Sequence, residues 1–168
     1  CRTADFRVLD AEARAAVPDI NLTTDVIVGF PGETEAEFDE SLSFVRAMGF
    51  ARSHVFPYSS RPGTVAAAMP GQVPSQIKAD RAARMRQACA EAECAFARQF
   101  LGQTARVLWE SARPGGDGLI WSGLTDNYLR VESVGAGDLR NSFGLVRLVR
   151  PVPGGLWAEI VDQTKSGE

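Results

Sequence analysis

Cysteine and histidine are scarce in this 168-residue sequence, which contains three cysteines and one histidine. An odd number of cysteines in a chain of ordinary composition argues against a disulfide framework. Cys89 and Cys94 lie five residues apart in a predicted helix, so they do not stack on one face and match no metal-binding spacing. We therefore expect small, partly buried thiols in a reducing cytoplasm. His54 lies in the middle of a predicted strand, where a packed or partly exposed neutral side chain is expected rather than a catalytic one.

A long apolar run is also absent, since no stretch approaches the roughly 20 residues that a helix needs to span a bilayer. The chain does not open with the charged and apolar segments of a secretory signal. Its first residue is cysteine rather than methionine, so we expect a fragment of a longer protein. With 45% hydrophobic and 23% charged residues, the composition is typical of a soluble protein with one domain or two small ones. We expect a cytoplasmic protein without membrane contact.

The net charge of -3 is distributed unevenly along the chain. Residues 1–74 contain 6 basic and 10 acidic side chains, residues 75–150 contain 11 and 8, and residues 151–168 contain 1 and 3. Nearly all basic residues in the middle are arginine, which suits bidentate contacts with phosphate. The excess is small, so on charge alone these arginines also fit a solvated helix face.

Hydrophobic spacing near the start of the chain predicts a helix followed by one βαβ unit. The first helix is expected at residues 4–16, and the two strands are expected at residues 20–30 and 51–58. Residues 26–28 form a continuous apolar run of valine and isoleucine. Such a run predicts a strand that is buried on both faces, as in a parallel sheet.

The predicted helix ends carry capping signals. Thr34 followed by Glu37 matches a capping box, so the helix between the two strands should begin there. Gly49 is the candidate for its C-cap. A longer helix is expected from Ser75 to about Phe100, because apolar residues recur along it at spacings of three and four.

The pattern changes after Gly102 to short β-like runs separated by Gly, Asp and Asn. Runs at intervals of about a dozen residues with turn signals between them predict a small antiparallel sheet or barrel. We therefore predict an α/β part followed by an all-β part, divided into residues 1–72, a connecting helix at 73–102 and a β domain at 103–164. A last strand is expected at residues 156–162, with a disordered tail after it.

Two segments of the α/β part resemble consecutive strands of radical S-adenosylmethionine methylthiotransferases. The first is Thr23 to Thr34 (TTDVIVGFPGET), and the second is His54 to Thr64 (HVFPYSSRPGT). Lys78 and Arg81 continue the same pattern. The separation of the segments matches one helix of a β/α barrel, so residues 1–72 would be the C-terminal β/α units of a radical SAM barrel of the partial TIM type.

The resemblance implies a cofactor site at the carboxyl ends of these strands, where β/α barrels carry their active sites. Four residues would border the adenine of S-adenosylmethionine: Ile27 and Gly29 from the first strand, and Phe56 and Tyr58 from the second. Glycine at a strand end lets the backbone approach a ligand closely. From the residues alone, Gly-Phe-Pro-Gly is also simply a good turn, and Phe56 and Tyr58 also fit core aromatics. No residue of this chain is expected to act as a catalytic acid or base.

The β part resembles a TRAM domain, the small β module with which this family holds RNA, through Ser122 to Val131 (SGLTDNYLRV). Aromatic and arginine side chains on a β surface can stack on bases and pair with phosphates. Five side chains are candidates for this contact: Arg106, Trp109, Trp121, Tyr128 and Arg130. Arg106, Tyr128 and Arg130 are the RNA-binding residues that we predict, since alternation along strands places several tryptophans in the core.

The resemblance implies a tRNA methylthiotransferase that adds a methylthio group to C2 of N6-threonylcarbamoyladenosine at position 37 of tRNA. Its partner would be the tRNA anticodon stem-loop, and we expect a monomer. The threonylcarbamoyladenosine branch is favoured by the run His54 to Phe56 and by Asn127-Tyr128. The same chemistry on isopentenyladenosine in tRNA or on ribosomal protein S12 is an alternative. A non-catalytic RNA-binding module is an alternative of another class.

The resemblance also implies S-adenosylmethionine and two 4Fe-4S clusters as cofactors of the full-length enzyme. The family binds its radical-generating cluster through Cys-x-x-x-Cys-x-x-Cys, and a second cluster through three cysteines of an upstream domain. Cys1, Cys89 and Cys94 match neither set. We therefore expect the cluster ligands upstream of residue 1 and no metal site in this chain. Without neighbouring strands, residues 1–70 should be poorly stable by themselves.

Overall fold

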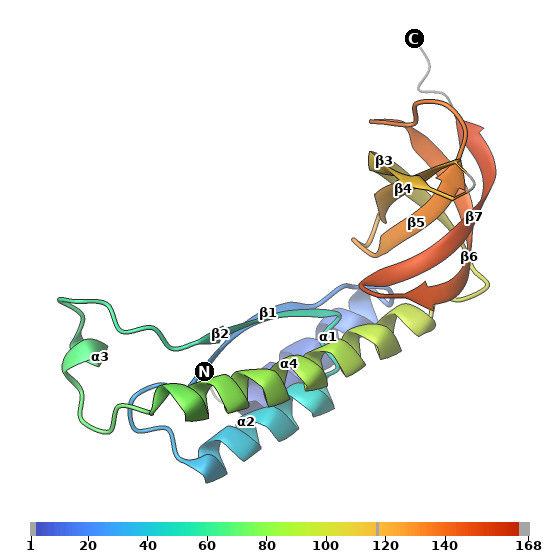
Figure 1. Ribbon diagram of the computed structural model, residues 1–168. Helices are drawn as coiled ribbons and strands as arrows, with labels where there is room; N and C mark the ends of the chain where they lie inside the picture. The colour runs from blue at the N-terminus through green and yellow to red at the C-terminus, as the bar shows by residue number, and fades with distance from the viewer. Residues whose placement is uncertain (1–2, 117, 165–168) are drawn as a thin grey trace. The chain divides into compact units, whose positions relative to one another are not determined.

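The structure is a computed structural model and describes residues 3–116 and 118–164. The chain forms two compact units, Cys1–Glu93 and Cys94–Glu168. Helices and two strands come first, and five strands follow (Figure 1). The boundary falls within the long helix α4 (Ser75–Arg98), so this helix contributes residues to both units. Among the described residues, no helix is long and apolar enough to cross a membrane.

The first unit contains a two-stranded parallel sheet. β1 (Thr23–Val28) pairs with β2 (Arg52–Pro57), and Val26 lies opposite Val55. The helix α2 (Glu35–Met48) connects the two strands. These three elements confirm the predicted βαβ unit.

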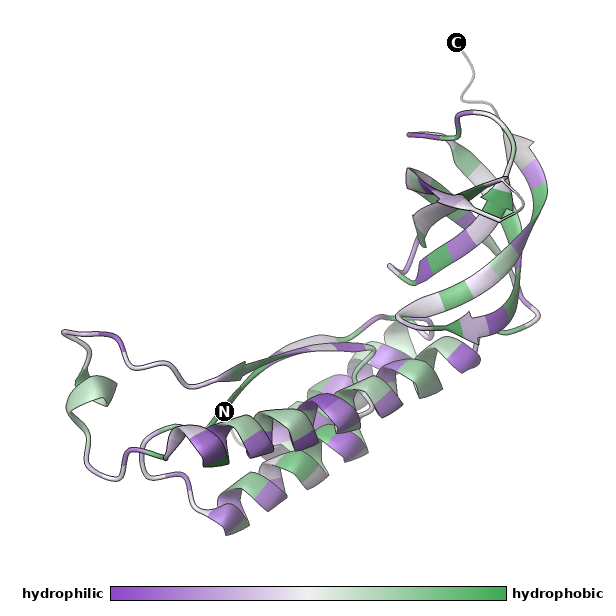
Figure 2. Ribbon diagram, in the orientation of Figure 1, coloured by the Kyte–Doolittle hydropathy of each residue, from purple (hydrophilic) through white to green (hydrophobic). Residues whose placement is uncertain are grey.

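Three further helices accompany the sheet. The helix α1 (Thr3–Ala16) precedes β1 and confirms the helix predicted over residues 4–16. The short helix α3 (Val65–Ala68) lies between β2 and α4. The helix α4 begins at Ser75 as predicted, and Met85 and Cys89 of its apolar stripe are buried. Figure 2 shows hydrophobic and hydrophilic residues alternating along α2 and α4, as expected for helices with one buried face.

Both ends of α2 are capped as the sequence predicts. The Glu37 N–H donates to Thr34 Oγ1 at 3.3 Å, and the Thr34 N–H donates to the Glu37 carboxylate at 2.8 Å. This reciprocal pair is the predicted capping box. Its hydrogen bonds, first the one from the Thr34 backbone, hold the pKa of Glu37 below its usual value. Gly49 ends the helix at φ 60°, a left-handed conformation that suits glycine.

One face of the β1–β2 sheet packs against the hydrophobic core, and the other face is exposed to solvent in the described structure. Val28, Phe38 and Met85 are at most 1% exposed and pack together beneath the sheet. By contrast, Ile27 is 57% exposed and Phe56 is 51% exposed, although both lie in strands. The prediction of a strand buried on both faces is therefore wrong for this chain. The described residues of α2 and α4 cover only one face, so alternate strand residues remain exposed.

The second unit is a closed β-barrel, which confirms the predicted small β domain. The strands follow one another around the barrel in the order β3-β4-β5-β7-β6. They are β3 (Thr104–Gly115), β4 (Gly118–Thr125), β5 (Arg130–Gly135), β6 (Phe143–Val152) and β7 (Gly155–Thr164). The described strands pair antiparallel except that β5 and β7 are parallel at Val131 and Leu156. The prediction of a purely antiparallel sheet is wrong at this one pair, because a closed ring of five strands cannot alternate in direction throughout.

The barrel core contains two of the side chains considered for RNA contact. Trp109 is fully buried and Trp121 is 2% exposed, so neither is available to stack on a base. Asn127 and Tyr128 belong to a turn rather than to the predicted β run, because β5 begins only at Arg130. The tail predicted to be disordered, residues 165–168, lies outside the described residues.

Candidate functional site

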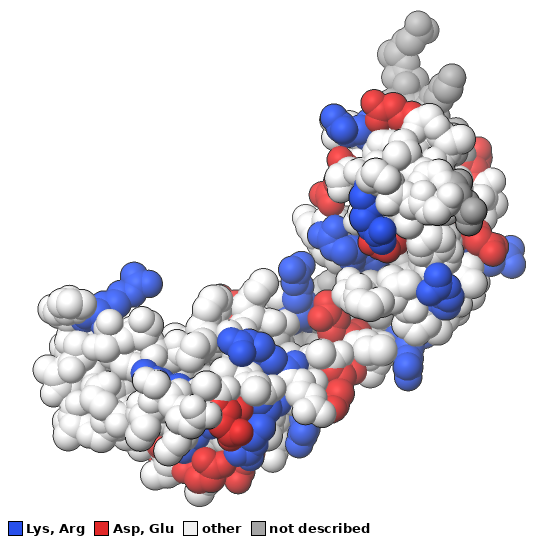
Figure 3. Space-filling model, in the orientation of Figure 1, with Lys and Arg blue, Asp and Glu red and all other residues white. Residues whose placement is uncertain are grey.

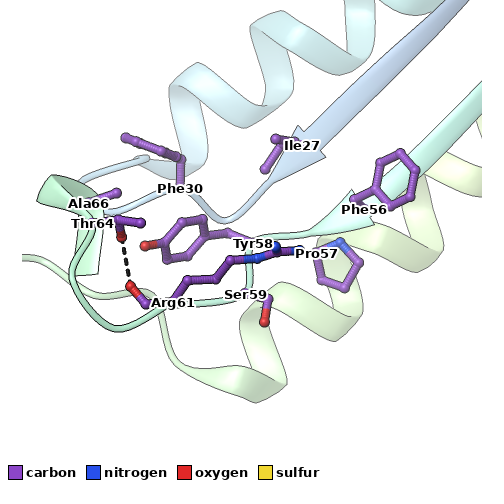
Figure 4. Close-up of a pocket in the computed structure, with 9 residues that line it drawn as sticks. All are labelled: Ile27, Phe30, Phe56, Pro57, Tyr58, Ser59, Arg61, Thr64 and Ala66. Carbon is purple, nitrogen blue, oxygen red and sulfur yellow. Dashed lines mark hydrogen bonds between the residues drawn. The ribbon is translucent and has the colours of Figure 1, made fainter.

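A cavity of about 410 Å³ lies where β1 and β2 end (Figure 4). Its volume falls within the range of small-molecule sites, roughly 300–1,000 Å³. Carboxyl ends of parallel strands are where β/α folds place their ligands. The lining residues are Ile27, Phe30, Phe56, Pro57, Tyr58, Ser59, Arg61, Thr64 and Ala66. The cavity is therefore built from the ends of two strands and from the loops that follow them.

The structure brings together three of the four cofactor residues predicted from the sequence. Ile27, Phe56 and Tyr58 all line the cavity, whereas Gly29 does not. Sequence reasoning quoted Phe30 and Arg61 within the two segments that carry the resemblance, but it did not name either as a cofactor residue. Their positions directly after predicted strands were the available signal, because binding residues concentrate on loops at strand ends.

The backbone and ring of Tyr58 are held by neighbours, yet its hydroxyl has no hydrogen-bond partner among the described residues. The Tyr58 N–H donates to the Val28 carbonyl at 2.8 Å, and its ring meets the Phe30 ring edge-on with centroids 5.3 Å apart. Figure 4 shows the ring extending from the end of β2 toward Thr64 and Ala66. The hydroxyl oxygen is buried and makes no hydrogen bond within the described structure. Leaving a buried hydroxyl unpaired is costly, so this atom is suited to a ligand that supplies the missing hydrogen bond.

Gly29 shapes the turn after β1. Its φ of 73° is left-handed, a conformation that side chains other than glycine rarely adopt. Its N–H donates to Glu33 Oε2 at 2.6 Å. A Cβ added at Gly29 would collide with the side chain of Lys78 from α4. Gly29 is thus required by the turn and by a close neighbour rather than by direct contact with the cavity.

Arg81 of α4 lies almost completely buried beside the same turn, with 4% of its surface exposed. Its Nη1 is 2.7 Å from Glu33 Oε2 and also donates to the Glu33 carbonyl at 3.0 Å. Its Nη2 is 3.1 Å from Glu35 Oε2. Glu33 therefore links the guanidinium of α4 to the Gly29 N–H. The sequence left a specific role for Glu33 in doubt, and a buried partner 48 residues away leaves no local signal that could have resolved it.

A second arginine extends this network at the surface. Arg84 contacts Glu35 at 2.5 Å and Asp39 at 2.6 Å. The guanidinium of Arg84, followed by that of Arg81, holds the pKa of Glu35 below its usual value. Figure 3 shows basic and acidic side chains intermingled over α2 and α4. Arg81 and Arg84 therefore form ion pairs within the first unit. Their positive charges are engaged in stabilising this unit and not in binding phosphate.

Thiols and imidazole do not form a metal site in the described part of the chain. No group of three or more His, Cys, Asp or Glu side chains is arranged to hold a metal ion there. Cys89 is buried and Cys94 is half-buried, and both are free thiols. Cys1 lies outside the described residues. His54 is exposed, and its ring stacks on Phe56 with the centroids 6.4 Å apart.

The predicted RNA-binding residues surround one end of the β4–β5 hairpin. Arg106 on β3 lies 3.2 Å from Asp126 in the hairpin turn, and its guanidinium also covers the Phe143 ring. Tyr128 stands in the same turn with φ 62° and 73% of its surface exposed. Arg130 begins β5 and donates to Ser122 Oγ at 3.0 Å. The three side chains therefore share one outer region of the barrel.

Comparison with known proteins gives a consistent set of relatives. No protein-family model matches the chain. Curated relatives include the tRNA-2-methylthio-N(6)-dimethylallyladenosine synthases of Francisella tularensis subsp. novicida (strain U112) and Francisella philomiragia subsp. philomiragia. Each is 34% identical to this chain over 157 residues, which is 94% of the chain and 35% of the relative. The chain thus spans about a third of the length of the curated relatives it matches.

Proposed function

We propose that this chain is the C-terminal portion of a radical S-adenosylmethionine methylthiotransferase that modifies tRNA. The similarity to tRNA methylthio-adenosine synthases carries this proposal, because 34% identity extends over 94% of the chain and so includes both compact units. Since the match covers only 35% of each relative, the activity belongs to a longer protein. The chain would contribute a cofactor-supporting cavity and an RNA-holding barrel.

The cavity at the ends of β1 and β2 fits the adenosyl part of S-adenosylmethionine. Ile27 and Phe56 present exposed apolar surface on which a planar base can lie. The buried Tyr58 hydroxyl offers a hydrogen bond to a polar edge of the ligand. Gly29 contributes by shaping the adjacent turn. When bound, S-adenosylmethionine supplies the transferable methyl group and the source of the radical.

The iron–sulfur chemistry would reside outside the described residues. The two described cysteines belong to no candidate metal group, whereas a 4Fe-4S cluster is held by cysteine thiolates. We propose that the full-length protein carries two such clusters on cysteines elsewhere in its sequence. The residues described in this chain would orient the cofactor and the RNA without ligating iron.

The β-barrel would hold the tRNA anticodon stem-loop in a cytoplasmic, monomeric enzyme. Five-stranded barrels of the oligonucleotide-binding type use the face of their second and third strands, which correspond here to β4 and β5. Tyr128 is exposed for stacking on an unpaired base. Arg106 and Asp126 are 59% and 67% exposed at their side chains, so their ion pair is weak and a phosphate can replace the carboxylate.

Two target nucleosides are supported by different observations. The run His54 to Phe56 and the pair Asn127-Tyr128 favour N6-threonylcarbamoyladenosine at position 37 of tRNA. The relatives carry dimethylallyladenosine, that is isopentenyladenosine, in their names. We propose the threonylcarbamoyl nucleoside as the substrate and the dimethylallyl nucleoside as the second candidate.

Mass spectrometry of tRNA nucleosides from a strain lacking the gene tests both the function and the target. We expect the methylthio form of threonylcarbamoyladenosine to disappear and to return when the intact gene is restored. Loss of methylthio-dimethylallyladenosine instead would transfer the assignment to the second candidate. Unchanged levels of both nucleosides would reject the proposed function.

A further inference from the structure

Lys78, near the start of α4, contacts both loops that follow the strands of the cavity. It lies outside the set of cavity-lining residues and makes no ion pair in the described structure. Its side chain is only half-buried. Its contacts therefore need an explanation other than charge pairing.

The ammonium of Lys78 is directed at Tyr58. Its Nζ donates to the Tyr58 carbonyl at 3.0 Å and lies 5.7 Å from the centroid of the Tyr58 ring. The N–H of Tyr58 is already bound to the Val28 carbonyl. Both backbone polar groups of Tyr58 are thus fixed, one by β1 and the other by Lys78. The backbone from which the ring extends is therefore held in place, and the ring itself is flanked by Phe30 and by the Lys78 ammonium.

The methylene groups of Lys78 occupy the space beside Gly29. A Cβ at Gly29 would collide with Lys78 Cγ, so glycine and lysine fit each other closely. The same turn is fastened by the hydrogen bond from the Gly29 N–H to Glu33 and by the buried contact between Glu33 and Arg81. One turn of α4, with Lys78 and Arg81 three residues apart, therefore holds the loops after β1 and β2 together.

We propose that Lys78 is a positioning residue for the S-adenosylmethionine site, acting through Tyr58 and Gly29. This inference rests on the proposed function, since it takes the cavity to be the cofactor site. The ammonium fixes the carbonyl of Tyr58 so that the phenol hydroxyl meets the bound adenosyl group. The methylene groups maintain the Gly29 turn beside it.

Two substitutions separate the ammonium from the methylene groups. Lys78→Met keeps an unbranched apolar side chain beside Gly29 and removes the donor. Lys78→Gln shortens the side chain but keeps an N–H donor. We expect Lys78→Met to weaken binding of S-adenosylhomocysteine by up to about tenfold, because Lys78 does not touch the ligand and a positioning residue passes on to it at most about what one hydrogen bond contributes. We expect Lys78→Gln to recover part of that affinity.

Isothermal titration calorimetry with S-adenosylhomocysteine, in the full-length protein that carries this chain, measures the effect. Arg86→Met is the matched control, because Arg86 is exposed on the same helix. Hydrogen exchange of the Tyr58 amide provides a second readout and should accelerate in Lys78→Met alone. If Lys78 only stabilised the fold, Lys78→Met would lower the melting temperature and leave the affinity for S-adenosylhomocysteine unchanged.

The outcomes distinguish this inference from the function on which it rests. Normal binding by Lys78→Met, together with normal exchange at Tyr58, would overturn the positioning role while leaving the cofactor site intact. A wild-type protein that binds no S-adenosylhomocysteine would overturn the cofactor site and the inference together. Weakened binding that Lys78→Gln partly restores, with Arg86→Met unchanged, supports the inference.

Discussion

Replacing Arg81 by methionine should destabilise the first unit strongly. Arg81 is 4% exposed, and its guanidinium is bound to both Glu33 and Glu35. Removing one partner of a buried ion pair leaves an uncompensated charge, which costs about 3–5 kcal/mol. The side chain of Glu35 is 55% exposed and keeps Arg84, whereas that of Glu33 is 13% exposed and loses the one cation with which it pairs in the described part of the chain. We therefore expect the lower end of that range, about 3 kcal/mol.

The distribution of chromophores allows the effect to be assigned to one unit. All three tryptophans, at positions 109, 121 and 157, lie in the second unit. Tryptophan fluorescence during urea unfolding therefore reports on the barrel, while far-ultraviolet circular dichroism reports mainly on the helices. Arg81→Met should lower the midpoint of the dichroism transition and leave the fluorescence midpoint unchanged. Arg84→Met is the matched control and should have a much smaller effect, since its ion pairs are exposed to solvent.

Neutralising Glu33 tests whether its unpaired negative charge causes the loss of stability in Arg81→Met. Adding Glu33→Gln to Arg81→Met removes the stranded negative charge but keeps an oxygen that can accept from the Gly29 N–H. The double variant should therefore recover part of the lost stability. Equal shifts in Arg81→Met and Arg84→Met, or no recovery in the double variant, would refute the buried-pair reasoning.

Three further predictions concern the helix cap, the core and the RNA surface. Thr34→Ala should cost about 1 kcal/mol in urea unfolding at neutral pH, because it removes the N-cap of α2. The pKa of Glu37 is lowered first by the Thr34 backbone N–H, which alanine keeps, and then by the Thr34 hydroxyl, which alanine removes. Only the hydroxyl's share of the effect depends on pH: it exists above the unfolded pKa and fades as pH falls through the folded one, so a Thr34→Ala difference that does not shrink at all in acid would contradict this. Residues 1–70 expressed alone should melt without cooperativity, because they lack Ala82 and Met85 of the core, and a sharp transition would argue otherwise. Arg130→Ala should weaken tRNA binding and reduce its logarithmic salt slope by about one, and an unchanged slope would count against a phosphate contact.

Local signals in the sequence identified most of the secondary structure. The capping box at Thr34 and the left-handed Gly49 arise from side chains and backbone within a few residues, so the ends of α2 were predictable. The turn at Tyr128 was missed because an aromatic residue between two β runs normally continues a strand. Its positive φ is instead supported by neighbouring hydrogen bonds, such as that from the Leu129 N–H to Thr125 Oγ1.

The candidate site was only partly predictable, because its supports come from distant parts of the chain. Ile27, Phe56 and Tyr58 follow from the resemblance and from their place at strand ends. The contacts of Lys78 with Tyr58 and of Arg81 with Glu33 join α4 to loops 20 and 48 residues earlier. Hydrophobic periodicity places the helix, but it does not specify which polar side chains reach back to the strands.

Direct assay of methylthio transfer tests the central claim. The purified full-length protein, with its clusters reconstituted, would be incubated with S-adenosylmethionine, a sulfur source, a reductant and tRNA carrying either N6-threonylcarbamoyladenosine or N6-dimethylallyladenosine. A tRNA with unmodified adenosine at position 37 serves as the control substrate. We predict that mass spectrometry of the digested nucleosides will show a methylthio group on the threonylcarbamoyl nucleoside. No methylthio product on either modified tRNA, with the clusters loaded, would contradict the assignment of this chain to a tRNA methylthiotransferase.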